Sequence, residues 1–524
     1  MPLLLALFLV GGMIIGNLLS RIGKLERFQV YPKTNKITSI IDYIAQDYVD
    51  SINKDQLVEL TIPEILKNLD PHSVYIPAEE LQQFKEPLEG NFSGIGVQFN
   101  MQDDTVAIIN TIPNGPSEKI GIKAGDRIIR VNDSLVAGIK MRSDDIVKML
   151  KGKRGTKVKV TIVRRGVAEP LDFDITRDRI PLNSVDVSYI IANDIGLIKI
   201  SEFSKTSYEE FLEAVKSLKA QGMKKLILDL RSNGGGYMDE ATKIADEFLD
   251  EGKLIVYTEG RAQPRHNVYS APRGECIDIE IIILIDELSA SASEIIAGAI
   301  QDNDRGLILG RRSFGKGLVQ QETIFNDGSA LRLTIARYYT PTGRCIQKPY
   351  NNGLEDYYYD IQNRFDRGEF IFADSIKFSD SLKYITPGGN IVYGGGGIMP
   401  DIFVPYDTIG MTNYLNQVRN RGLIYRYAFK YTDNNRSILN QFSDYREISD
   451  YLDKQELLIK FADFAESNGI KKDIEEIIIS EKIILTQLKA YIARNIIDNP
   501  GYYHIIQDID LTLQKGIEIL ASEK

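Results

Sequence analysis

The chain has 524 residues, of which 43% are hydrophobic and 26% charged, and its formal net charge is −10. These values predict a globular protein of roughly two to four domains and exclude a general nucleic-acid binder, which needs a basic surface. The two cysteines, Cys276 and Cys345, have no metal-ligand spacing, and they either pair or stay free. We therefore expect no metal or other cofactor and no nucleic-acid partner.

Residues 2–19 are almost wholly apolar, with Asn17 as their one polar side chain. About 18 residues rising about 1.5 Å each are just long enough to cross a bilayer core. No convincing cleavage site follows, so we expect residues 1–24 to form an uncleaved membrane anchor or signal segment rather than a buried core helix. Arg21 and Lys24 come next, and the positive-inside rule alone would keep the rest of the chain in the cytoplasm.

Residues 25–91 are expected to form a helical N-terminal region. Apolar residues recur at helical spacing over residues 36–69, and Pro63 indicates a helix start, where a missing N–H is tolerated. The sequence Asp-Pro-His-Ser at residues 70–73 then predicts a turn. We expect His72 to hydrogen bond within this turn rather than to act in catalysis.

Short alternating strands take over from Phe92 to about Thr176. Gly-Ile-Gly-Val opens this block, Ala-Gly-Asp leads into a strand near its centre, and residues 142–150 have the period of a helix. This ordered set resembles a PDZ domain, which we place at residues 92–176. The resemblance implies a loop whose glycines let backbone N–H groups converge on a chain-terminal carboxylate, with the peptide added beside the next strand. The substrate-binding residues that it implies are Gly94, Ile95, Gly96 and Val97.

An α/β pattern begins with a strand at residues 195–200, a helix near 207–218 and a second strand at 224–230. The second strand runs into Arg-Ser-Asn-Gly-Gly-Gly at residues 231–236, and a helix follows at 239–249. In an open sheet, a turn at the carboxyl end of a strand is the usual place for a site. Neither G-x-G-x-x-G nor a following lysine is present, so this turn is a weak candidate for a phosphate loop.

A buried strand at residues 279–285 is followed by a polar turn, by Ser-Ala-Ser-Ala-Ser-Glu at 289–294, and by an apolar pattern of helical period. A hydroxyl placed there lies beside the N–H groups of a helix N-terminus, which suit a nucleophile whose attack creates an oxyanion. The spacing S-x-x-E also fits a capping box, which explains one serine without catalysis. The residues alone do not choose among Ser289, Ser291 and Ser293.

A further apolar strand at residues 307–309 leads into a loop in which Lys316 lies between Gly315 and Gly317. A lysine that points inward from such a loop loses hydration, so its pKa falls and it can act as a general base. Lowering a lysine pKa from about 10.4 to about 7.5 costs roughly 4 kcal/mol, so the burial has to be substantial. The spacing Gly310-x4-Gly315-Lys316 approaches a P-loop, but Gly317 replaces the Ser or Thr that holds Mg²⁺, which disfavours a nucleotide-binding protein.

The remaining chain continues the core to residue 408 and then becomes helical. A strand at residues 331–339 is followed by an acidic and aromatic segment at about 350–382, which we interpret as an insertion that forms a lid or surface loop. A glycine-rich turn and a strand at 402–404 close the core. Residues 409–524 are mainly helical by period, and an extension of this size can brace a core or form a homo-oligomer.

The order and spacing of these motifs resemble the C-terminal processing peptidases, also called tail-specific proteases. The chain has S-A-S-A-S-E, then 25 residues from the middle serine to the lysine of F-G-K-G, then Gln320 four residues further on. The resemblance extends over roughly residues 36–404 and includes Asp-Pro-His-Ser and Asp-Leu-Arg-x-Asn-x-Gly-Gly.

This resemblance implies roles for particular residues. Ser291 would be the nucleophile, Lys316 the base and Gln320 the residue that orients the lysine. Asp302 matches an acidic position in the helix after the nucleophile. The oxyanion hole would combine a glycine N–H with a second backbone donor, and the candidates are Gly235, Gly236 and Ala292.

The resulting expectation is an α/β catalytic core (α+β overall) at residues 177–408, with a PDZ domain and helical N- and C-terminal regions. The resemblance implies a serine endopeptidase that cleaves, through an acyl-enzyme, proteins recognised by their apolar C-terminal tails. It implies a cell-envelope location, with an inner-membrane anchor and the catalytic part in the periplasm, opposite to the orientation that Arg21 and Lys24 favour. Expected partners are the protein substrates, a second copy bound through the C-terminal helices, and an adaptor protein.

Two alternatives stay open at this point. A membrane-tethered PDZ scaffold that lacks catalysis predicts binding without cleavage. A histidine-dependent hydrolase would have to draw its base from the three histidines of the chain, His72, His266 and His504.

Overall fold

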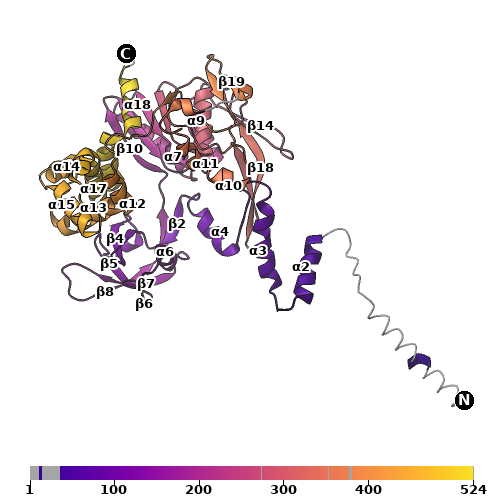
Figure 1. Ribbon diagram of the computed structural model, residues 1–524, viewed down its shortest axis with the longest axis horizontal. Coiled ribbons are helices and arrows are strands. Elements are labelled where there is room, and N and C mark those ends of the chain that lie inside the picture. Colours follow the sequence, from indigo (N-terminus) through magenta and orange to yellow (C-terminus); the bar gives the residue numbers. More distant parts are fainter. Residues whose placement is uncertain (1–10, 14–35, 273, 352, 377–379, 523–524) are drawn as a thin grey trace. The chain divides into compact units, whose positions relative to one another are not determined.

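A computed structural model describes residues 11–13, 36–272, 274–351, 353–376 and 380–522 (Figure 1). The chain divides into two compact units, residues 1–69 and residues 70–524. The predicted membrane anchor or signal segment, residues 1–24, lies outside the described part except for residues 11–13. Within the described ranges, no helix is both long and apolar enough to cross a membrane.

The described part of the first unit contains α2 (Lys36–Asp47) and α3 (Lys54–Leu66). Pro63 lies inside α3, so the prediction that it marks a helix start was wrong. The helix begins at Lys54 because the side chain of Asn53 accepts hydrogen bonds from the N–H groups of Asp55 and Gln56, at 3.0 and 3.2 Å.

The PDZ-like block folds as a sheet in the order β3-β4-β5-β7-β8, with β6 paired to β5 and a separate β2–β9 ladder. Alternate residues of these strands form a closed apolar core that includes Val106, Ile128 and Val160. The elements are β2 (Asn91–Gly94), β3 (Val97–Gln102), β4 (Thr105–Thr111), α5 (Pro116–Lys119), β5 (Arg127–Val131), β6 (Ser134–Leu135), α6 (Ser143–Leu150), β7 (Lys157–Val163), β8 (Leu171–Thr176) and β9 (Asp178–Pro181).

The predicted catalytic core is built on a six-stranded sheet in the order β10-β11-β12-β15-β16-β21. Only the β10–β11 pair is antiparallel, and every later pair is parallel. The strands are β10 (Val185–Ala192), β11 (Ile195–Ile200), β12 (Lys225–Asp229), β15 (Glu280–Ile285), β16 (Leu307–Gly310) and β21 (Ile402–Phe403). The near-continuous apolar runs of β12 and β15 are typical of parallel strands that are covered on both faces.

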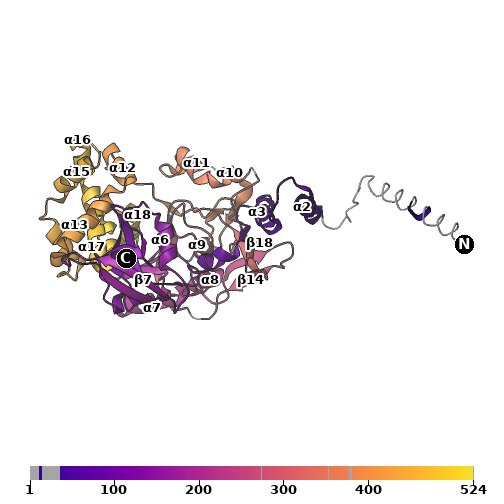
Figure 2. The same ribbon diagram turned by 90° about the horizontal axis from the view of Figure 1, so that it is seen from below.

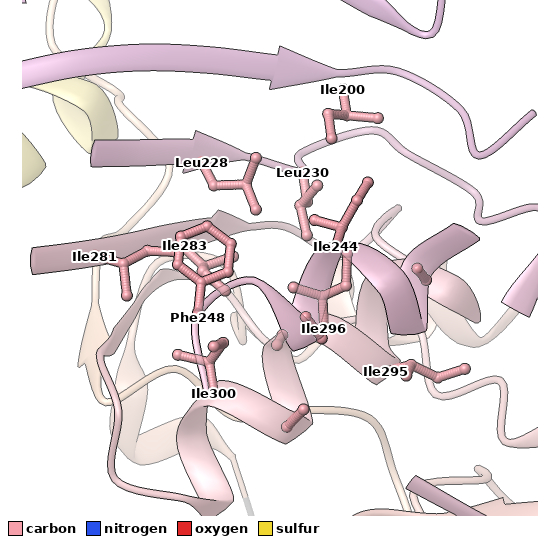
Figure 3. Packing of buried hydrophobic residues seen from close by; sticks show 14 of the residues in the cluster. Ile200, Leu228, Leu230, Ile244, Phe248, Ile281, Ile283, Ile295, Ile296 and Ile300 are labelled. Carbon is pink, nitrogen blue, oxygen red and sulfur yellow. The ribbon is translucent and has the colours of Figure 1, made fainter. Parts of the chain in front are cut away.

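Three helices cover one face of this sheet: α7 (Ser207–Ala220), α8 (Met238–Asp246) and α9 (Ala292–Asp302). Figure 3 shows Leu228 and Ile283 of the strands packed against Phe248 and Ile296. The opposite face is covered by α18 (Leu511–Ser522), whose Leu513 contributes to a second apolar cluster with strand residues. The last helix of the predicted C-terminal extension therefore packs on the core.

A second sheet carries β1 (Val74–Ile76), β13 (Leu254–Glu259), β14 (His266–Tyr269), β17 (Leu318–Ile324) and β18 (Ala330–Tyr339). Its strand β18 pairs with both β1 and β17. Because β1 follows the predicted Asp-Pro-His-Ser turn, this pairing brings the turn close to the chain that follows Lys316.

The described part of the segment at about 350–382 contains short helices joined by turns. It contains α10 (Leu354–Tyr358) and α11 (Asp360–Asp366), which are neighbours (Figure 2). Two short 3-10 helices follow, η1 (Ala373–Ser375) and η2 (Asp380–Leu382), and then the hairpin β19 (Lys383–Ile385) and β20 (Ile391–Tyr393). Another short helix, α4 (Ala78–Lys85), precedes the PDZ-like block.

The C-terminal region forms its own helical cluster, drawn in orange to yellow in Figure 1. Its members are α12 (Asn413–Asn420), α13 (Leu423–Leu439), α14 (Tyr445–Leu452), α15 (Leu457–Ser467), α16 (Ile474–Ile479), α17 (Glu481–Ile506) and η3 (Gln507–Ile509). An ion pair of 2.8 Å between Arg127 and Asp433 joins this cluster to the PDZ-like block.

Candidate active site

Three loops meet at one edge of the central sheet because they follow the carboxyl ends of the parallel strands β12, β15 and β16. A cavity of about 730 Å³ lies at this edge. Among the residues that line it are five of the predicted site residues: Ser291, Lys316, Gln320, Gly235 and Gly236. The fold thus brings together groups that are up to 85 residues apart in the sequence (320 − 235 = 85).

Ser291 is the N-cap residue of α9 and has φ 56° and ψ −111°. A positive φ is strained for a residue with a side chain, and such strain is common where a side chain must be presented to a site. The neighbouring Ser289 and Ser293 are both 0% exposed, and their hydroxyls donate to the backbone carbonyls of Leu230 and Asn233. Of the three serines, Ser291 is the one that lines the cavity.

The carboxylate of Glu294 is fully buried and accepts four hydrogen bonds. Its donors are the N–H of Ser291 at 2.8 Å, the hydroxyl of Ser313, and the N–H groups of Gly315 and Lys316 at 2.7 and 2.9 Å. Burial raises the pKa of Glu294 to about 7, while these hydrogen bonds act in the opposite direction. The capping interpretation therefore holds for the Ser291 backbone, and the same carboxylate also fastens the loop that carries the lysine.

Lys316 is partly buried in the wall of the cavity, and its Nζ lies 3.3 Å from Oε1 of Gln320. Burial lowers the pKa of Lys316 below its usual value, and the positive charge of Arg332 lowers it further. The negative charges of Glu294 and Asp70 act in the opposite direction. A lysine with a lowered pKa is neutral over a wider range of pH, which is what a general base requires.

The loop around Lys316 does not have the arrangement of a P-loop. A P-loop connects a strand to a helix, whose N-terminus contributes to phosphate binding. Here the loop leaves β16 and enters a strand, β17. The nucleotide-binding alternative is therefore disfavoured for two reasons. The loop does not lead into a helix, and it lacks the Ser or Thr hydroxyl that would hold Mg²⁺.

The glycine turn after β12 packs directly against the serine. A Cβ atom on Gly235 would lie 2.7 Å from Cβ of Ser291, and one on Gly236 would lie 2.1 Å from the carbonyl oxygen of Phe203. The N–H of Gly235 already donates to Oδ1 of Asn233 at 2.8 Å. Of the two glycines, Gly236 is therefore the better candidate for an oxyanion donor. Asn233 stabilises the turn, because its side chain also donates to the carbonyl of Ile200 at 3.0 Å.

Asp302 lies at the far end of α9, about 16 Å along the helix axis from Ser291 at the usual helical rise. It forms a 2.7 Å ion pair with Arg344, and both side chains are 0% exposed. It also accepts hydrogen bonds from the N–H and the hydroxyl of Thr342. The structure does not bring Asp302 to the cavity, and its contacts fasten the end of α9 to the segment after β18.

The histidines are placed differently from one another. His72 lies closer to the site than the sequence indicated, because its backbone carbonyl accepts a hydrogen bond from the side-chain amide of Gln320. Its ring, however, is engaged with the hydroxyl of Tyr357 at 2.7 Å. His266 is exposed on β14, and His504 stacks on aromatic rings. The described lining of the cavity contains no histidine, which disfavours the histidine-dependent hydrolase.

Sequence reasoning missed two residues of the site, Tyr338 and Arg332. The Tyr338 hydroxyl lies 3.0 Å from the carbonyl oxygen of Ser291 and 2.7 Å from that of Lys316, so it joins the two loops. Tyr338 occupies an inward position of an alternating strand, and a buried tyrosine hydroxyl needs a hydrogen-bond partner. The alternating pattern of this strand could therefore have identified Tyr338 from the sequence. Arg332 comes into place through the pairing of β17 with β18, which the sequence pattern does not reveal.

The predicted substrate-binding residues Gly94, Ile95, Gly96 and Val97 line a second cavity, of about 180 Å³. Other residues lining it are Val147 and Leu150 of α6 and the following Lys151. The cavity therefore lies between a glycine-containing loop, the edge strand β3 and a helix. Lys151 also pairs with Glu86 at 2.7 Å.

Three family models match the chain. Residues 194–356 match peptidase family S41, residues 93–175 match the PDZ domain, and residues 414–498 match a family of unknown function. The first two matches fall on the catalytic core and on the PDZ-like block that the sequence predicted.

Known proteins with similar sequences agree with these matches. The carboxy-terminal-processing protease of Bartonella bacilliformis is 36% identical over 322 residues, which cover 60% of this chain and 73% of that protein. The carboxy-terminal processing protease CtpA of Bacillus subtilis is 36% identical over 317 residues, covering 60% and 67%. A solved structure of the photosystem II D1 C-terminal processing protease is 25% identical, covers 58% of this chain and 88% of that one, and has a TM-score of 0.33.

The expected fold, an α/β catalytic core with a PDZ domain and a helical C-terminal region, is confirmed. The chain therefore belongs to the carboxy-terminal processing proteases of peptidase family S41, which are serine-type peptidases with a PDZ domain.

Proposed function

We propose that the protein is an endopeptidase with a Ser291–Lys316 dyad that cleaves proteins presented by their C-terminal tails. The observation that carries this proposal is the shared cavity in which a strained, accessible serine and a desolvated lysine lie at the same sheet edge. The scaffold alternative has no comparable support, because a binding module needs neither the strain nor the desolvation.

In the proposed reaction, neutral Lys316 removes the proton from the Ser291 hydroxyl, whose oxygen attacks the scissile carbonyl carbon. The resulting oxyanion accepts hydrogen bonds from the N–H groups of Gly236 and Ala292. Lys316 then donates its proton to the leaving amine, and the acyl group stays on Ser291 until water releases it. Gln320 keeps the lysine oriented, because its side-chain oxygen accepts a hydrogen bond from Nζ of Lys316.

Tail recognition is assigned to the cavity of the PDZ domain. The N–H groups of Gly94, Ile95 and Gly96 would bind the terminal carboxylate, and the peptide would extend β3 as an added strand. Apolar side chains of α6 and the loop favour an apolar last residue. An adaptor protein and a second copy bound through the C-terminal helices remain proposals of the same kind.

We also propose that residues 2–19 anchor the protein in the inner membrane, with the catalytic part in the periplasm. The length and apolar character of this segment support an anchor. Protease treatment of spheroplasts that express the full chain tests the orientation: degradation of the catalytic part is expected, and protection would contradict a periplasmic location.

The dyad is tested by cleavage of a protein with an apolar C-terminal tail, using Ser291→Ala and Lys316→Ala. We expect each variant to lose about 10⁴-fold or more of kcat, because nucleophile and base act as one unit. The matched control is Tyr269→Phe, an exposed residue of β14, which should leave kcat unchanged. Full activity of either dyad variant would remove that residue from its proposed role.

The pH profile tests the electrostatics of the base. Arg332 lowers the pKa of Lys316, so Arg332→Gln should raise that pKa. Because the base must be neutral, the acid limb of kcat/KM should then move to higher pH. Arg337→Gln, on the exposed side of the same strand, is the control and should leave the limb in place. A limb that stays fixed, or moves to lower pH, in Arg332→Gln would contradict this account of Lys316.

Binding to the PDZ cavity is measured with Ser291→Ala protein and a fluorescent peptide that ends in an apolar residue. Amidation of the peptide terminus should weaken binding about tenfold or more, because charge-assisted hydrogen bonds to the carboxylate are lost. Val147→Asp should weaken binding of the free acid by placing a negative charge in the cavity wall. Equal affinity for the acid and the amide would show that the terminus is not what this cavity binds.

A further inference from the structure

Tyr357 of α10 is buried between the proposed catalytic loop and the Asp-Pro-His-Ser turn. The side chain is 2% exposed, and its hydroxyl lies 2.7 Å from Nε2 of His72. Its ring meets the ring of His72 edge-on at 5.4 Å and the ring of Phe314 at 6.0 Å. Phe314 is two residues before Lys316, so Tyr357 contacts both the turn and the loop of the proposed base.

A chain of hydrogen bonds leads from Tyr357 to the proposed base. The backbone carbonyl of His72 accepts a hydrogen bond from the side-chain nitrogen of Gln320. Because that amide group donates through its nitrogen to His72, its oxygen is turned toward Lys316, whose Nζ lies 3.3 Å away. The position of His72 therefore decides how Gln320 faces the lysine.

Tyr357 is itself firmly held. The ammonium group of Lys348 lies 3.8 and 4.2 Å from the centroids of the Phe314 and Tyr357 rings. It also donates to the carbonyl of Tyr357 at 3.2 Å and to Asp360 at 3.1 Å. The backbone N–H of Lys348 donates to the carbonyl of Gly315 at 2.9 Å, and the side chain of Gln347 accepts a hydrogen bond from the N–H of Gly317 at 2.8 Å. The segment that holds Tyr357 is thus joined to the residues on both sides of Lys316.

The protonation states fit this arrangement. Burial and the charge of Lys316 lower the pKa of His72 to about 4, so its ring is neutral near pH 7. Burial raises the pKa of Tyr357, so the phenol keeps its proton. A neutral imidazole and a phenol form a hydrogen bond without a charge that would repel Lys316.

We propose that Tyr357, which lies outside the sequence motifs that predicted the site, is a positioning residue that holds Gln320, and through it Lys316, by fixing His72. This inference rests on the proposed Ser291–Lys316 dyad. It assigns the segment at about 350–382 a role in aligning the base, rather than that of the lid or surface loop that the sequence suggested.

The test measures kcat and KM of Tyr357→Phe, which keeps the ring and removes the hydroxyl. We expect kcat to fall about tenfold, as for the loss of one hydrogen bond that aligns the base, with KM unchanged. His72→Ala, which keeps the backbone carbonyl but removes the ring, should show a similar loss. The matched control is Tyr359→Phe, an exposed tyrosine two residues away, which should behave like the wild type.

A double-mutant cycle separates positioning from a general loss of stability. If Tyr357 acts through Gln320, then Tyr357→Phe should add little to the loss caused by Gln320→Ala. Additive losses would overturn the proposal, and so would wild-type kcat in both Tyr357→Phe and His72→Ala.

Urea midpoints of all variants show whether a loss of kcat comes from unfolding. If the smaller fraction of folded protein accounted for the whole loss of kcat, that result would also overturn the proposal. Ser291→Ala and Lys316→Ala, assayed in parallel, show whether the dyad itself has failed, since active dyad variants would remove the proposed function first.

Discussion

The buried carboxylate of Glu294 is the interaction on which the proposed site depends. Ser291 and Lys316 lie on different loops, and this one side chain accepts hydrogen bonds from the backbone N–H groups of both. A buried polar group without its partner costs about 1–3 kcal/mol, and more if it is charged, so the two loops are held to the carboxylate. The hydroxyl of Tyr338 binds the carbonyl oxygens of the same two residues. Both the N–H groups and the carbonyl groups of Ser291 and Lys316 are therefore held in place.

The two sheets make separate contributions to this arrangement. Parallel strands of the central sheet supply the serine, the glycine turn and the start of the lysine loop, because their carboxyl ends meet at one edge. The second sheet supplies the surroundings of the lysine, with Gln320 on β17 and Arg332 on β18. The C-terminal segment takes part as well, since Arg231 of the glycine turn pairs with both Asp229 and Asp510, the residue before α18.

Local pattern was enough to predict most strands and helices of the core. The strand predicted at residues 195–200 is β11. Ser291 and Gln320, which the family resemblance singled out, line one cavity together with Lys316. Partners across the two sheets could not be predicted, because strand register is not written in a single sequence. This is why Arg332 could not be predicted. Tyr357 lies on α10, in a segment without a clear apolar period, so no pattern in the sequence indicated that it packs against the site. The start of α3 was predicted wrongly for a different reason: the helix begins at the cap formed by Asn53, and Pro63 lies inside it.

The most direct test of the dyad is to trap its covalent intermediate. A slowly hydrolysed ester substrate is mixed with the protein, quenched in acid within the first turnover, digested and analysed by mass spectrometry. We expect an acyl group on the peptide that contains Ser291, and none when Lys316 is replaced by alanine. An acyl group on Ser289 or Ser293, or equal acylation without the lysine, would contradict it.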